Sequence, residues 1–129
     1  MFKFAQARTL NYVVPIVVGN AKDKRTFPSH MCSTVLAQQL GLSGQQLPTG
    51  HGCFFDFGTD AYDVALWMKD CLHPLTAVFF DSTGRVVHKA FMDHTKPTEL
   101  HRCPCRARYV LELHPADAEA INVGDNLQS

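Results

Sequence analysis

Cysteine and histidine stand close together in the stretch His101-Arg102-Cys103-Pro104-Cys105. In an extended chain, positions 101, 103 and 105 point the same way, with successive members about 6.5 Å apart. Thiolate and imidazole groups are proper zinc ligands, and His94 or His114 could supply a fourth. The usual zinc knuckle has two residues between its cysteines, whereas this stretch has one. Three interpretations stay open: a zinc site, a redox or disulfide pair, and free thiols in a loop.

A thiol nucleophile is a second kind of chemistry to weigh. Cys103 or Cys105 beside a histidine could serve a thiol-dependent, hydrolase-like enzyme, which needs a thiol with a lowered pKa. His51 lies between two glycines and could act as a general acid or base. A surface histidine is the simpler interpretation, because nothing in the sequence fixes a partner for it. Cys53 and Cys71 lie in apolar stretches and are interpreted as small core residues.

The stretch Trp67-Met68-Lys69-Asp70 is a candidate for binding. Strand alternation would place Trp67 and Lys69 on one face. An aromatic ring beside an ammonium group could bind a small ligand or a carboxylate. The alternative is structural: Trp67 packs in the core, while Lys69 lays its stem along the barrel and pairs with Glu112 or Asp125.

The charge of the chain is balanced, with twelve basic and twelve acidic side chains. A net charge of zero provides no long-range field to attract nucleic acid, so we expect no nucleic-acid partner. Arg102, Arg106 and Arg108 still cluster beside His101. This cluster is interpreted as a solvated strand and loop face, and a local basic patch stays the alternative. Arg108 is retained as a candidate binding residue.

These candidate residues must be positioned by the strands and helices around them. The first third of the chain predicts few such elements. The β-branched run 10–18 predicts a strand, which Pro15 restricts to a sheet edge or a bulge. The polar stretch 19–29 predicts turn and loop. Ser33-Thr34 offers helix caps, and the spacing that follows predicts one short helix ending at Gly41.

The rest of the chain predicts strands separated by turns. A loop is expected over 41–52, and Asp81-Ser82-Thr83-Gly84 predicts a hairpin turn in which glycine supplies a positive φ. We further expect a long loop over 92–104, one or two helical turns over 115–120, and a short final strand. Strands are expected at 53–57, 64–70, 75–80, 85–91 and 106–113.

The spacing of these elements indicates the fold class. About six to eight strands recur every ten to twelve residues or so, with one or two short helices. This predicts a mainly β (α+β) domain, either a small antiparallel β-barrel or a sandwich-like fold, and argues against alternating βαβ units. A chain of 129 residues predicts a single domain, residues 1–129.

One series of motifs has a distinctive order and spacing. The series consists of Gly41-Leu42, Leu47-Pro48, Gly52-Cys53-Phe54-Phe55-Asp56-Phe57, the block Trp67-Met68-Lys69-Asp70-Cys71-Leu72-His73-Pro74-Leu75, the hairpin 79–87, Cys105, Arg108-Tyr109-Val110-Leu111-Glu112-Leu113 and Gly124-Asp125. Over residues 41–127 it resembles the family known as domain of unknown function 192. The resemblance implies a compact β-rich fold and no established activity.

The chain departs from the family pattern at polar positions. Gln45 stands where the family has arginine, Asp70-Cys71 replaces its Asn-Thr, and Thr76 replaces the aspartate after its Pro-Leu. If those positions form a shared site, the resemblance implies that it is altered or lost here. Residues 10–40 are a divergent N-terminal strand, loop and helix that match the family poorly.

No segment predicts export or membrane insertion. The longest apolar run, 12–18, is broken by Pro15 and is far shorter than the ~20 residues of a spanning helix. No small-residue cleavage site follows it. Five cysteines without a disulfide spacing are expected to be free thiols. We expect a cytoplasmic protein without membrane contact, and a monomer or homodimer because the edge strand at Pro15 leaves pairing open.

The expected function is that of a small non-enzymatic binding domain. It would recognise a small ligand or a protein partner near Trp67 and Lys69, with His51 and Arg108 as further binding residues. No cofactor is predicted, apart from zinc as the alternative at His101, Cys103 and Cys105. The rival function is the thiol- or metal-dependent, hydrolase-like enzyme that uses Cys103 or Cys105 with a nearby histidine.

Overall fold

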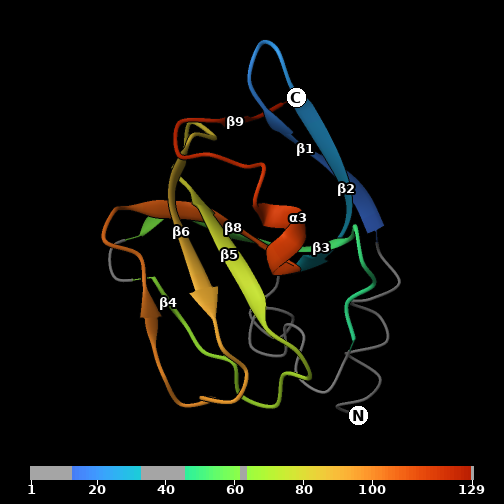
Figure 1. Cartoon of the computed structure of the whole chain (residues 1–129). Helices are drawn as coiled ribbons and strands as arrows, with labels where there is room; N and C mark the ends of the chain where they lie inside the picture. Colours follow the sequence, from blue (N-terminus) through green and yellow to red (C-terminus); the bar gives the residue numbers. More distant parts are fainter. Residues whose placement is uncertain (1–12, 33–45, 62–63, 129) are drawn as a thin grey trace.

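The strands of the computed structural model lie in two sheets, and the structure describes residues 13–32, 46–61 and 64–128. The larger sheet has seven strands in the order β6-β5-β8-β3-β2-β1-β9, and the smaller sheet pairs β4 with β7 (Figure 1). Within the described residues one short helix is present, α3, Pro115–Ala118. The strands are β1 Val13–Gly19, β2 Lys24–Cys32, β3 Gly52–Ala61, β4 Ala65–Leu66, β5 Leu75–Phe80, β6 Val86–Met92, β7 His101–Arg102, β8 Ala107–Leu113 and β9 Asn126–Leu127.

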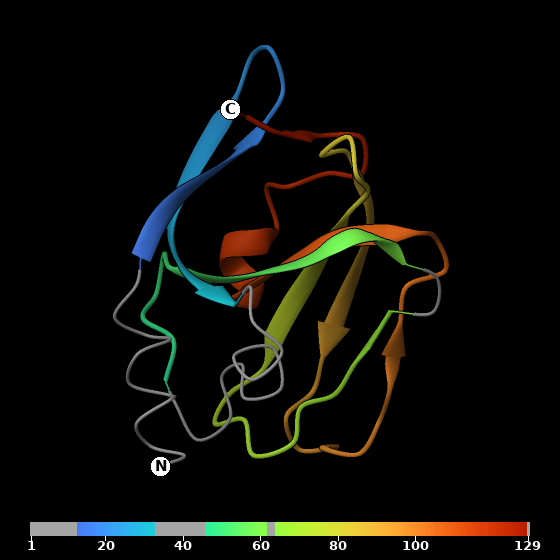
Figure 2. The ribbon, with the colours of Figure 1, turned by 180° about the vertical axis from the view of Figure 1, so that it is seen from behind.

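The larger sheet curls into a half-barrel, which confirms the mainly β prediction. β6 and β9 stand at opposite ends of the strand order, yet Arg85, just before β6, forms an isolated bridge with Asn126 of β9. The Leu127 amide also donates a hydrogen bond of 2.8 Å to the Gly84 carbonyl. The curl therefore brings the two ends of the sheet together beside the C-terminal segment, as both views show (Figures 1 and 2).

Both faces of the larger sheet are covered. All six residues of β5 are buried, as expected for a strand packed on both sides. The face that we call the loop face gathers Cys53, Phe55, Met68, Ala77, Phe79 and Val110. The opposite face, the helix face, gathers Phe54, Val78, Phe80, Leu111, Ala118 and Ile121. Lys89 joins this face to the helix, because its Nζ donates to the carbonyls of Ala118 and Ile121 at 2.8 and 2.7 Å.

The prediction of turn and loop over residues 19–29 is wrong. The turn is short, residues 20–23, and the polar stretch after it is the strand β2, paired with β1 along its length. Prolines are tolerated because Pro15 and Pro28 face each other in the ladder. Neither residue has an amide to donate, so their positions must be ones that make no hydrogen bond across the pair.

The expectation of a purely antiparallel sheet is also wrong at one pair of strands. β2 and β3 run parallel, with Ser29 opposite Gly52 and Cys32 opposite Phe55. Among the described residues, β1 pairs with β9 only at Val18 and Gly19, so most of β1 has β2 as its one partner there. The edge position predicted from Pro15 agrees with this pairing.

Several predicted elements are confirmed. β5 has the predicted bounds, β6 and β8 begin one residue later than predicted, and β3 contains the predicted strand 53–57. Gly84 closes the β5–β6 hairpin with a φ of 87°. The short helix expected after Ser33 and the position Gln45 lie outside the described residues. Among those described, no helix has the length and apolar character needed to span a bilayer.

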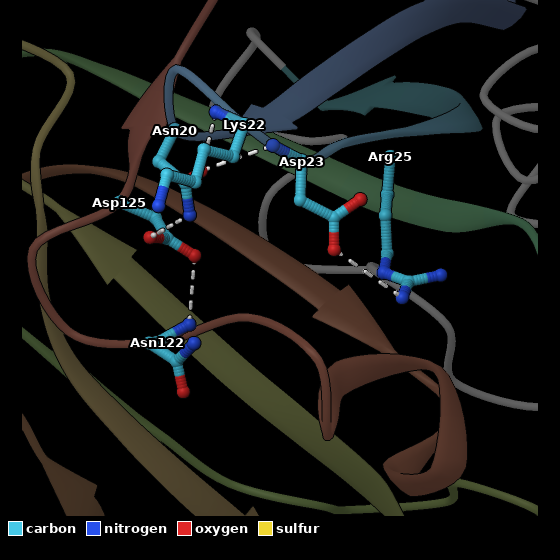
Figure 3. Close-up of polar contacts among 6 residues, drawn as sticks. All are labelled: Asn20, Lys22, Asp23, Arg25, Asn122 and Asp125. Carbon is cyan, nitrogen blue, oxygen red and sulfur yellow. Dashed lines mark hydrogen bonds and ion pairs between the residues drawn. The ribbon is translucent and has the colours of Figure 1, made fainter.

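The C-terminal Gly124-Asp125 pair is structural. Gly124 has a φ of 100° and donates its amide to the Val86 carbonyl at 2.9 Å. The buried Asp125 accepts the Asn122 amide at 2.9 Å and the Asn20 side-chain amide at 3.4 Å, so it ties the β1–β2 turn to the C-terminal segment (Figure 3).

Candidate functional site

The predicted strand over residues 64–70 is wrong beyond its first residues, because the range ends in a turn. Only Ala65–Leu66 pairs as β4, and Lys69 and Asp70 form a turn closed by a 3.0 Å hydrogen bond from the Cys71 amide to the Met68 carbonyl. Asp70 has a φ of 61°, a left-handed conformation that aspartate tolerates better than most residues. We call residues 67–74, between β4 and β5, the Trp67 loop.

Trp67 lies on the surface of this loop, so the interpretation that places it in the core is wrong. Its exposed fraction is 51%, whereas that of its neighbour Met68 is 0%. The Lys69 Nζ lies 5.6 Å from the centroid of the Trp67 ring, within the range of a cation–π contact. Met68 thus anchors the loop to the loop face, and the indole is displayed to solvent.

The two-stranded sheet continues this surface. Leu66 pairs with His101 and Ala65 with Arg102, and continuing this antiparallel register by one residue beyond the two strands sets Trp67 across from Leu100. Alternation puts Trp67, Leu100 and Arg102 on one face, and all three are exposed. Leu66 points the other way and packs against the loop face. The outward face therefore presents an indole, an aliphatic side chain and a guanidinium group.

Glu112 is buried beneath the loop face. It is 5% exposed, and it lies opposite Cys53 on β3 and opposite Ala77 on β5. Burial raises the pKa of this carboxyl to about 8, because removal from water disfavours the charged form. The pKa of the Cys71 thiol is raised to about 12. Burial of this thiol is the largest cause, and the negative charges of Glu112 and Asp70 are the next. Glu112 and Cys71 are thus both held in the neutral form near neutral pH.

One of the two thiols proposed for catalysis, Cys103, does not show the required electrostatics. Cys103 is buried, and burial raises the pKa of its thiol, the opposite of what a nucleophile needs. Cys105 is exposed, with its Sγ 4.0 Å from the Val87 carbonyl. In the described part of the chain, no three histidine, cysteine or acidic side chains come together as a metal site. His101, Cys103 and Cys105 are therefore not gathered as zinc ligands in this fold.

Histidines meet at one end of the larger sheet. His51 stacks on His30 with ring centroids 6.3 Å apart, and His73 stacks on His114 at 4.5 Å. His114 follows β8 directly and His51 precedes β3, whose first residue Gly52 pairs with the last residue of β8. His51 is half-buried in this packing, whereas the sequence was interpreted as placing a histidine on the surface here.

Arg108 lies toward the other end of β8. Its Nε donates to Asp56 Oδ1 at 3.2 Å, and its guanidinium lies 4.8 Å from the Tyr109 ring centroid. About five strand residues separate it from the level of Gly52, which is roughly 17 Å. Arg108 and His51 therefore do not contribute to a single small site.

A comparison with protein families matches residues 17–129 to the family DUF192, described as an uncharacterized ACR. This chain belongs to DUF192. The match confirms the resemblance found over residues 41–127, and it also includes part of the N-terminal region that was expected to diverge. No curated protein matches the chain.

Solved structures share the DUF192 fold seen here. A protein of unknown function from Novosphingobium aromaticivorans DSM 12444 has a TM-score of 0.82 and 22% identity, over 91% of this chain and 85% of that one. A protein from Sinorhizobium meliloti 1021, named as a candidate transcription regulator, has a TM-score of 0.83 and 22% identity, over 91% of this chain and 93% of that one. At this identity the likeness shows the fold alone.

The geometry divides the DUF192-like motifs between two roles. Gly124-Asp125 holds the C-terminal segment in place through hydrogen bonds, whereas residues 67–74 of the tryptophan block form the Trp67 loop near Glu112. Sequence reasoning missed Glu112 as a buried group, although it is the one charged residue in the apolar run Tyr109-Val110-Leu111-Glu112-Leu113. It also missed the pair His73 and His114, for which 41 positions of separation leave no local signal.

Proposed function

We propose that this domain is a non-enzymatic binding module that docks a segment of a partner protein on the outward face of its small sheet. The observation that carries the proposal is the contrast between Trp67, which is 51% exposed, and Met68, which is 0% exposed. The single tryptophan of the chain is displayed on a turn, and the residue beside it anchors that turn in the core.

The anchoring gives Trp67 the properties of a binding hot spot. A tryptophan offers a large contact area with few rotatable bonds, and its loop is already held by Met68 and by the turn at Asp70. A partner that covers the indole gains apolar burial and loses little conformational entropy on this side of the interface. Leu100, the residue just before β7, is 51% exposed and extends the apolar area.

The charges around the indole define the chemistry of the partner. Arg102 lies on the same outward face, and the ammonium group of Lys69 lies over the Trp67 ring. An apolar centre flanked by cations complements a peptide segment that combines apolar side chains with aspartate or glutamate. The rival thiol enzyme gains no support from Cys103, because burial raises the pKa of its thiol.

The test is selection of a displayed random peptide library on the intact protein, followed by calorimetric titration of the wild type and the variants with the enriched peptides, and by Trp67 fluorescence in the proteins that keep this residue. We expect enriched peptides that carry apolar and acidic residues and that shift the tryptophan emission. Trp67→Ala should weaken binding by about thirtyfold or more, as loss of a hot spot does. Trp67→Phe and Lys69→Met should weaken binding while the protein stays folded.

Phe91→Ser is the matched control, since Phe91 is 60% exposed on β6 and lies outside the small sheet. It should bind the peptides as the wild type does. Peptides that bind Trp67→Ala and the wild type equally, or a library that yields no binder, would refute the proposal. Unfolding of both Trp67→Phe and Lys69→Met would show that these residues are structural.

A further inference from the structure

Segment 46–51 is held through the backbone of Leu47 by two histidines. The Leu47 amide donates to Nε2 of His73 at 3.1 Å, and the Leu47 carbonyl is hydrogen bonded to Nε2 of His114. The Leu47 side chain is 2% exposed and packs in the loop face. One buried residue thus receives both of its main-chain contacts from imidazole rings that lie 26 and 67 positions away.

These contacts fix the tautomer of each ring. A nitrogen that accepts the Leu47 amide carries no proton, so neutral His73 holds its proton on Nδ1, 3.1 Å from the Pro74 carbonyl. A carbonyl can only accept, so His114 holds a proton on Nε2. His114 keeps its hydrogen bond in either charge state, whereas His73 can accept only while it is neutral.

The two rings also touch each other. His73 and His114 stack with centroids 4.5 Å apart and an interplanar angle of 17°. Two neutral imidazoles pack well in this arrangement, but two imidazolium ions would repel each other at this distance. Protonation therefore affects the contact twice: it removes the acceptor for the Leu47 amide, and it places like charges face to face.

We infer that His73 and His114 form an acid-sensitive clamp that holds segment 46–51 while His73 is neutral and releases it when His73 is protonated. Imidazole is the side chain whose ordinary change of charge falls between about pH 5 and 8. A second tether, from the Gly50 amide to Asp117 Oδ2 at 2.7 Å, keeps the segment attached to α3 when the clamp opens. Release is then local to Leu47 and does not require unfolding of the sheet.

Other titratable groups lie on the elements packed around the pair. Asp70 and Cys71 are on the loop of His73, Glu112 precedes His114 on β8, and Asp117 is on α3. His51 and the His30 beneath it are the histidines of the neighbouring pair. Glu112 is neutral near neutral pH and supplies no counter-charge to the rings.

The clamp connects to the Trp67 loop, because His73 belongs to that loop and Leu47 packs in the same core cluster as Met68. Opening the clamp would loosen the support under Trp67 in mildly acidic conditions. This last link rests on the proposed function, whereas the clamp itself does not. The two are separable, since release of Leu47 is measured without any partner.

The test is hydrogen exchange of the Leu47 amide, followed by NMR on the full chain and corrected for intrinsic exchange. Lowering the pH from about 7.5 to about 5 should reduce protection of this amide about tenfold, as expected when one buried hydrogen bond is lost. His73→Gln should keep an uncharged oxygen acceptor, so its protection should not vary with pH. His114→Gln keeps a donor and removes one charge, and should lose less protection in acid than the wild type.

His88→Gln is the control, because His88 is half-buried against the Phe79 ring at 5.5 Å and should respond as the wild type does. Constant protection of Leu47 in the wild-type protein over this pH range would overturn the inference. A loss of protection in His73→Gln as large as that of the wild type would also overturn it, since no imidazole then accepts the Leu47 amide.

Discussion

Glu112 lies directly opposite Cys53 in the β3–β8 ladder, with its carboxyl inside the apolar loop face. A carboxyl in such a position is neutral unless a cation approaches it, and its pKa of about 8 expresses the cost of charging it there. The Trp67 loop covers this group through Met68 and Cys71. The surface proposed for binding thus rests on a core that contains a titratable acid.

The first prediction concerns the pH dependence of stability. The ordinary pKa of glutamate is 4.5, and that of Glu112 in the folded protein is about 8, so folding takes up a proton between these values. The stabilisation is fully present below pH 4.5 and is lost as pH rises through about 8. The loss in the free energy of unfolding should be on the order of a few kcal/mol. Glu112→Gln, a neutral isostere, should remove this loss.

Urea unfolding followed by Trp67 fluorescence at about pH 5 and about pH 9 measures this effect. The variant should approach or match the wild type at the lower pH and exceed it at the higher pH. Because other groups titrate equally in both proteins, the difference between them reports Glu112 alone. A difference that does not change with pH would contradict the prediction.

The second prediction separates the two adjacent residues of the Trp67 loop. Met68→Ala removes a fully buried side chain and should lower the free energy of unfolding by about 2–5 kcal/mol. Trp67→Ala should cost much less stability, because half of the indole is already in water. Thermal unfolding of the two variants measures both effects. Equal losses would show that Trp67 supports the fold rather than a surface.

How far the sequence predicts this fold can be judged at β5 and β2. β5 is predicted at its observed bounds because a run of five apolar residues and one threonine is bounded by proline and by the Asp81–Gly84 turn. β2 is missed because Lys24, Arg25 and Thr26 are polar, and because Asp23 before the strand and Pro28 within it are residue types typical of turns. Its strand conformation comes from pairing with β1 and β3, which is information that lies elsewhere in the chain.

The candidate site was predicted in part. Trp67 and Lys69 were chosen on a strand alternation that does not exist, and they come together through a turn at Asp70. Local sequence does not distinguish a two-residue strand followed by a turn from a longer strand. Burial of Met68 decides between them, and the core residues that bury it lie elsewhere in the chain. The pairing of β4 with β7 joins Leu66 to His101, 35 positions further along the chain, and no motif indicates it.

The third prediction concerns the thiols and tests the rival enzyme. Cys105 is exposed and should react with an alkylating reagent at the rate of an ordinary free thiol. Cys71 and Cys103 should react much more slowly near neutral pH, because burial raises the pKa of both thiols and keeps them protonated. Mass spectrometry of the intact, folded protein over time orders the sites. Rapid labelling of Cys103 would contradict this prediction and would support the hypothesis of a thiol-dependent enzyme.

The fourth prediction concerns the buried carboxylate Asp125. Asp125→Ala leaves the Asn122 amide without its 2.9 Å acceptor and removes the contact to Asn20 that ties the β1–β2 turn to the C-terminal segment (Figure 3). Leaving a part-buried donor unpaired should lower the free energy of unfolding by about 1–3 kcal/mol.

Asp23→Ala provides the matched control on the same turn. The Asp23 carboxylate lies 3.8 Å from Arg25, and the two side chains are 69% and 51% exposed. An ion pair in that environment is screened by water and contributes little, so this variant should unfold at nearly the wild-type urea concentration. Urea titration of both variants compares them directly. If Asp23→Ala is destabilised as much as Asp125→Ala, the turn itself is the sensitive feature and the buried carboxylate is not what holds the C-terminal segment.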